Sequence, residues 1–149
     1  MDSDTASEVR TTSTTPTPAN RLRRQGAVSS RRFLRSFVFA AAGLAYLFRT
    51  QRNARVHLGL GAAACAVAGW VGAARAEWAV LVLTIAGVLV LEGLNTALEA
   101  IVDLASPRYH PLAKVAKDVA AGMVLIAAIA AVIIGLLILG PPVWQRVAP

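Results

Sequence analysis

Four polar side chains enter an otherwise apolar stretch of the sequence at regular spacing. In "VLVLEGLNTALEAIVDLASP" they are Glu92, Asn95, Glu99 and Asp103. Successive residues of an α-helix turn by about 100°, so this spacing places the four on one helix face. A carboxylate in apolar surroundings can take a proton from an alcohol, and carboxylate and amide oxygens suit Mg²⁺. The stripe therefore predicts a site for proton transfer and metal binding, although a polar helix–helix contact or a solvated helix end would also use such residues.

The stretch that follows adds positive charge. Lys114 and Lys117 could hold phosphates, and Asp118 would begin the next helix, where an acid is favoured by the helix dipole. Mg²⁺ bridges phosphate oxygens of a nucleotide. A base just inside a bilayer with cations just outside it fits one substrate class, a lipid alcohol whose hydroxyl lies at the interface.

Long apolar segments must position this site. The chain is 56% hydrophobic, and its mean hydropathy is +0.59. Segments at about 56–74, 78–104 and 117–140 each approach or exceed the roughly 20 residues that cross a hydrocarbon core. The sequence predicts an all-α integral membrane protein with three transmembrane helices.

The flanking regions are different in composition. Residues 1–28 are rich in Thr, Ser and Pro and are predicted to be disordered. At about 31–50, apolar residues recur at helical spacing among arginines, which predicts an amphipathic helix on the membrane surface. The alternative, a twin-arginine export signal at Arg31 and Arg32, lacks a cleavage site. Residues 29–142 would form the membrane domain, and 143–149 a C-terminal tail.

Charge is distributed unevenly in this chain of net charge +7. Ten of the fifteen basic residues lie at or before Arg55. A basic chain can bind nucleic acid, but the apolar remainder makes anionic lipid headgroups the expected partner, and we expect no nucleic-acid binding. The positive-inside rule places the N-terminus in the cytoplasm and the C-terminus outside. The three tryptophans would then lie near the outer interface.

The string "LEGLNTALEAIVDLASPRYHPLAKVAKDVAAGMVL" closely resembles the signature of the small prokaryotic diacylglycerol kinase/undecaprenol kinase family. The matching positions are Glu92, Asn95, Glu99, Asp103, Tyr109, His110, Lys117 and Asp118, within a resemblance that covers about residues 31–140. It implies a surface helix and three spans assembled as a homotrimer with shared active sites, in the bacterial inner membrane. It also implies ATP as phosphate donor and Mg²⁺ as cofactor.

Residue roles follow from the same resemblance. It implies that Glu92 is the catalytic base and that Glu99 binds magnesium. Asn95, Lys117 and Asp118 would help to bind ATP and its metal. Apart from the resemblance, Arg32 or Arg35 of the surface helix could reach the nucleotide, and Arg32 is taken as the ATP-binding candidate. The supporting residues would be Asp103, Tyr109, His110 and Lys114.

Two positions depart from the family pattern. Gln51 stands where a second metal-binding glutamate is common, and a neutral amide holds Mg²⁺ less strongly. Gly93 replaces a larger aliphatic residue. The strings "RNARVHL" and "SPRYHPLAKVAKDVAAG" look more like the Gram-positive branch, so undecaprenol is the expected substrate and diacylglycerol the alternative.

Two other classes remain open. A small proton-coupled transporter could use Glu92 as its binding carboxylate, but it would not need Glu99, Asp103 and Lys117 at the cytoplasmic end. A non-catalytic lipid-binding scaffold would leave Glu92 unexplained. Packing roles are expected for the lone Cys65 and for the small residues around it, and an interfacial or hydrogen-bonded role for His57.

Overall fold

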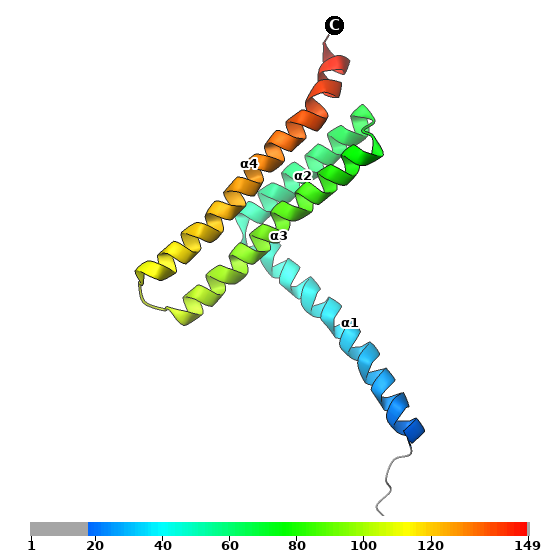
Figure 1. Cartoon of the computed structure of the whole chain (residues 1–149), viewed down its shortest axis with the longest axis vertical. Helices are drawn as coiled ribbons and strands as arrows, with labels where there is room; N and C mark the ends of the chain where they lie inside the picture. The colour runs from blue at the N-terminus through cyan, green and yellow to red at the C-terminus, as the bar shows by residue number, and fades with distance from the viewer. Residues whose placement is uncertain (1–17, 149) are drawn as a thin grey trace, which may run out of the picture. The chain divides into compact units, whose positions relative to one another are not determined.

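The chain is helical throughout the part that the structure covers. The computed structural model describes the backbone of residues 18–148 and the side chains of residues 32, 33 and 35–148. Four helices follow one another: α1 (Pro18–Thr50), α2 (Arg52–Val71), α3 (Arg75–Ala105) and α4 (Pro111–Val147) (Figure 1). Of these, α2, α3 and α4 are long and apolar enough to cross a membrane. The prediction of an N-terminal helix followed by three candidate spans is confirmed, and the homotrimer stays a prediction.

Helix α1 starts earlier than the sequence predicted. It begins at Pro18, inside the segment 1–28 that was expected to be disordered. Proline is favoured at the first position of a helix, and the following Ala, Leu and Arg residues form helices readily. Residues 1–17, which carry the rest of that expectation, lie outside the described part of the chain.

Helix α4 also ends later than expected. It continues through Pro141 and Pro142 to Val147, so residues 143–147 of the predicted C-terminal tail are helical. Proline removes a backbone donor and usually interrupts a helix. Here Arg146 secures the last turn, because its guanidinium donates to the carbonyl of Val71 at 3.3 Å and lies 5.7 Å from the ring centroid of Trp70.

The chain forms two compact units, residues 1–42 and 43–149. In the first unit, Phe33 and Phe37 pack edge to face with ring centroids 5.0 Å apart, and both remain exposed. This exposed aromatic pair belongs to the apolar stripe that predicted a membrane-surface helix. Attachment to a membrane stays a prediction.

The second unit contains an antiparallel bundle in which α3 packs against both α2 and α4 (Figure 1). Gly72 takes a left-handed conformation with φ 76° and ends α2, its N–H donating to Ala68. Glu77 accepts a hydrogen bond from the N–H of Ala74 at 2.6 Å and so begins α3. The tight turn makes α2 and α3 antiparallel neighbours.

Extended backbone at Gln51 separates α1 from α2. Its N–H still donates to the carbonyl of Leu47 at 2.8 Å. Arg55, one turn into α2, reaches back and donates to the carbonyl of Arg49 at 3.2 Å. A cation at these unpaired carbonyls is favoured by the helix dipole. The junction is therefore held by backbone and guanidinium contacts.

Few side chains are buried in the described part of the chain. The buried set comprises Leu47, Ala54, Ala68, Leu81, Val88, Glu92, Thr96 and Val124. Most large apolar side chains of α2, α3 and α4 are exposed, as is expected when lipid or neighbouring subunits cover a helix bundle. A carboxylate among so few buried groups is the exceptional feature.

Gly61 allows α2 and α3 to approach closely. A Cβ atom at this position would lie 2.8 Å from Cγ2 of Ile85, whereas Gly59 has open space around it. Ile85 is β-branched and cannot easily turn away.

We predict that Gly61→Ala lowers the free energy of unfolding by about 1–3 kcal/mol, measured in detergent, while the matched Gly59→Ala leaves it nearly unchanged. Equal effects of the two substitutions would contradict this packing.

Candidate functional site

Glu92 lies inside the protein and not against lipid. It is 2% exposed and sits on α3, in the half of the bundle that leads to the α3–α4 turn. Its Oε1 is 3.3 Å from Nε2 of His57 on α2. That contact does not have hydrogen-bond alignment, and Oε1 has no hydrogen-bond partner among the described residues. A buried carboxylate in this condition is ready to interact with a further polar group.

The polar stripe continues along α3 toward the turn. Asn95 donates its amide hydrogen to Oε1 of Glu99 at 2.9 Å. Its own Oδ1 is buried and has no partner within the described part of the chain. Thr96 donates to the backbone carbonyl of Glu92 at 2.9 Å. The predicted helix face is therefore formed, with two unpaired oxygens, Glu92 Oε1 and Asn95 Oδ1, one turn apart.

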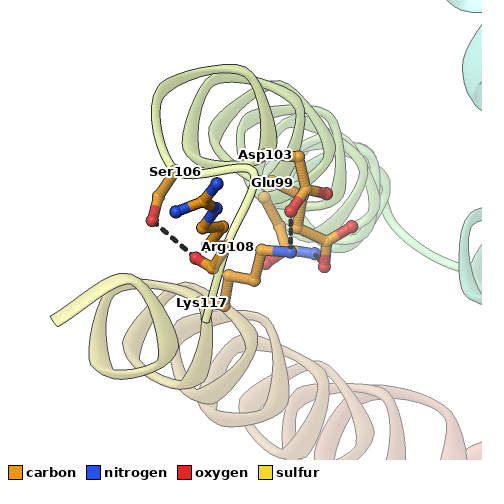
Figure 2. A network of polar contacts seen from close by, with 6 residues as sticks. Glu99, Asp103, Ser106, Arg108 and Lys117 are labelled. Carbon is orange, nitrogen blue, oxygen red and sulfur yellow. Dashed lines mark hydrogen bonds and ion pairs between the residues drawn. The ribbon is translucent and has the colours of Figure 1, made fainter. Parts of the chain in front are cut away.

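Cations and carboxylates meet where α3 and α4 approach the turn that joins them. Figure 2 shows Glu99, Asp103 and Lys117 pointing into the same space between the two helices. Lys117 of α4 forms an ion pair with Asp103 of α3, and Lys114 pairs with Asp118 on α4 itself. These groups are largely exposed, so each pair contributes little to stability and can exchange partners.

The turn itself is ordered by short-range hydrogen bonds. Ser106 donates to the carbonyl of Arg108 at 2.9 Å (Figure 2). His110 is the N-cap of α4, and its Nδ1 accepts from the N–H of Leu112 at 3.2 Å. Tyr109 is 81% exposed. The contacts of His110 give it a structural role in this turn, and a role of Tyr109 at the site stays a prediction.

The two remaining candidates lie nearer the N-terminus. The side chain of Gln51 makes no hydrogen bond with any described residue. Arg32 is exposed on the first unit, where its carbonyl accepts a hydrogen bond from Ser36 at 3.2 Å. A role of Gln51 in metal binding stays a prediction. A role of Arg32 in ATP binding also stays a prediction.

The donor set at Glu99 suits a weakly coordinated hard cation. Among the described residues, no group of three His, Cys, Asp or Glu side chains is arranged to hold a metal ion. Mg²⁺ does not require such a cage, because it is usually bound through one or two carboxylates together with waters and substrate phosphates. The Glu99 carboxylate and the unpartnered Oδ1 of Asn95 fit that pattern.

An apolar groove of about 440 Å³ runs between α2, α3 and α4. His57 lines one end of it, and the lining continues through Gly61 and Val88 to Gly135 and Val143. Since His57 also contacts Glu92, the groove ends beside the buried carboxylate. Sequence reasoning missed both the groove and the His57–Glu92 contact. The available signal was that His57 is the one basic or acidic residue of its apolar segment.

The described residues thus place a buried carboxylate next to an apolar groove, with cations near the α3–α4 turn at one end of three candidate membrane spans. The chain belongs to the prokaryotic diacylglycerol kinase family, whose profile matches residues 38–139. The resemblance drawn from the sequence motifs is thereby confirmed.

Named relatives differ in their substrates. The chain is 53% identical over 108 residues to a diacylglycerol kinase of Synechocystis, an alignment of 72% of this chain and 62% of that protein. It is 49% identical over 113 residues to the undecaprenol kinase of Bacillus subtilis, covering 74% and 89%. A diacylglycerol kinase of Escherichia coli is 39% identical over 70 residues, covering 47% and 57%. The match thus spans less than two thirds of the Synechocystis protein, and these names indicate lipid kinases without deciding between two lipids.

Proposed function

We propose that this protein transfers the γ-phosphoryl group of ATP to the hydroxyl of a membrane lipid alcohol, with undecaprenol as the preferred substrate. The observation that carries the proposal is Glu92, 2% exposed, unpartnered at Oε1 and adjacent to an apolar groove. A hydrocarbon chain in the groove would bring its hydroxyl to a carboxylate that can accept a proton. Diacylglycerol is the second candidate.

The chemistry requires one proton acceptor. The hydroxyl oxygen of the lipid attacks the γ-phosphorus, the bond to the β–γ bridging oxygen breaks, and the hydroxyl proton passes to Glu92. Positioned general bases commonly contribute about 10²–10⁴-fold to such reactions. ADP and the phosphorylated lipid leave, and the proton is then released to solvent.

The cationic end of the bundle would hold the nucleotide. Lys117 and Lys114 can exchange their carboxylate partners for phosphate oxygens, because both ion pairs are exposed. Asp118 would be freed in the same exchange. Glu99 with Asn95 would bind Mg²⁺, which neutralises developing phosphate charge.

We assign the α3–α4 turn to the cytoplasmic side, since Arg108, Lys114 and Lys117 cluster there. The N-terminus would then be cytoplasmic and the C-terminus outside the bacterial inner membrane. A homotrimer with shared active sites is consistent with the many exposed apolar side chains of α2, α3 and α4.

The length of the groove favours a long chain. Its lining extends along α4 from Ala128 to Val143, which corresponds to about 22 Å at the helical rise of 1.5 Å per residue. One leaflet of the hydrocarbon core is only about 15 Å thick. A polyprenyl chain could occupy the full length of this groove.

The first prediction from the proposed function concerns Glu92. Purified protein with Mg²⁺ and radiolabelled ATP should phosphorylate undecaprenol faster than diacylglycerol when both are offered in the same mixed micelles. Glu92→Gln should lower kcat at least about 100-fold, because the amide cannot accept the proton, while the detergent-solubilised assembly keeps its size. Turnover by Glu92→Gln at the wild-type rate would exclude Glu92 as the base, and an inactive but folded wild-type protein would reject the kinase proposal.

The second prediction concerns the groove. Gly135 lines it and has open space where a Cβ would be, so Gly135→Leu inserts a side chain into the groove. We expect a roughly 10-fold loss of kcat/KM for undecaprenol, equivalent to about 1.4 kcal/mol, and little change for a short prenol. Gly122→Leu is the matched control, because Gly122 has equal space on α4 but does not line the groove. Equal losses for both prenols would contradict the assignment.

The third prediction concerns Gln51. Gln51→Glu adds a carboxylate at the α1–α2 junction, and a carboxylate attracts Mg²⁺ more strongly than an amide. The Mg²⁺ concentration for half-maximal turnover should therefore fall several-fold. Gln51→Leu, which removes the polar group, serves as control. An unchanged Mg²⁺ requirement in Gln51→Glu would show that this position does not contact the metal.

A further inference from the structure

His57 has surroundings that a packing role does not explain. Its Nε2 lies 3.3 Å from Oε1 of Glu92, and its side chain is 20% exposed against 3% for that of Glu92. The imidazole also forms one end of the apolar groove. His57 therefore touches both the buried carboxylate and the space proposed for the lipid chain.

The contact is close to a hydrogen bond but not aligned as one. Oε1 of Glu92 is buried and unpartnered within the described residues. Leaving such an oxygen unpaired costs about 1–3 kcal/mol. A small rotation of the imidazole would satisfy it, and catalytic hydrogen bonds often tighten only in the substrate complex.

The same contact distinguishes the two oxygens of the Glu92 carboxylate. Oε1 faces the imidazole, whereas Oε2 accepts no hydrogen bond from a described residue and is not fully buried. Oε2 is thus the oxygen left to meet a substrate hydroxyl. A carboxylate that can rotate freely would present either oxygen at varied angles, and misplacement of a reacting group by about 1 Å can cost about 100-fold in rate.

We infer that His57 is a positioning residue for the phosphoryl transfer: in the substrate complex its Nε2–H donates to Oε1 of Glu92 and turns Oε2 toward the lipid hydroxyl. The inference rests on the proposed kinase function. It requires the imidazole to carry hydrogen on Nε2, as one neutral tautomer and the cation both do. No covalent step passes through His57.

Three substitutions test this role. The amide nitrogen of Gln is as many bonds from the backbone as Nε2 of His. The amide nitrogen of Asn is one bond nearer to the backbone. Leu has no hydrogen-bond donor in its side chain. In an ATP and undecaprenol assay, His57→Leu should lower kcat about 10- to 100-fold while the KM values for ATP and lipid change less than about three-fold. His57→Gln should recover most of kcat, and His57→Asn should not. Cys65→Ala on the same helix is the control and should match wild type.

The outcomes separate the two proposals. Wild-type protein that phosphorylates no lipid rejects the kinase function itself. If wild type is active, Glu92→Gln inactive and His57→Leu fully active, only the role of His57 is overturned. Equal kcat values for His57→Gln and His57→Asn overturn it as well, and this comparison remains decisive if His57→Leu fails to fold, since both amides are equally polar. A loss confined to the lipid KM would assign His57 to substrate binding and would likewise overturn positioning.

Discussion

The burial of one carboxylate within a helix bundle constrains the rest of this molecule. An ionisable side chain at membrane depth costs roughly 3 kcal/mol or more unless protein or water surrounds it. Glu92 is buried because α3 packs against both α2 and α4 and because the close approach at Gly61 brings α2 near. His57 is the polar group that this approach supplies. The burial of the Glu92 carboxylate thus depends on the close helix packing at Gly61.

From Glu92 toward the α3–α4 turn, the polar side chains along one face of α3 become progressively more exposed. Asn95 and Glu99 are half-buried and bonded to each other, while Asp103 is exposed and paired with Lys117 of α4. A single helix face therefore presents, in order of increasing exposure, a buried carboxylate, an amide whose oxygen has no partner among the described residues, and an ion pair. This order suits the proposed reaction between an apolar acceptor and a highly charged donor.

The sequence predicted the helices and the stripe because both depend on local periodicity. The spacing of Glu92, Asn95 and Glu99 sets their common face whatever the neighbours are. The sequence could not predict the His57–Glu92 contact, since that contact depends on how closely α2 and α3 approach each other at Gly61. The helix ends also differ from the prediction. A composition rich in Ser, Thr and Pro concealed the start at Pro18, and the turn after Pro142 is supported by contacts of Arg146 across the bundle that the sequence does not reveal.

The pairing of Lys117 with Asp103 has a consequence for how ligands assemble. Under the proposed function, a nucleotide that took Lys117 would displace Asp103 and leave its carboxylate without a counter-ion. A divalent cation arriving with that nucleotide would then meet a free carboxylate near Glu99 (Figure 2). Nucleotide and metal would then bind cooperatively, each raising the affinity for the other, and by thermodynamic linkage the gain is equal in both directions. An ordinary surface ion pair would thus couple two ligands of opposite charge.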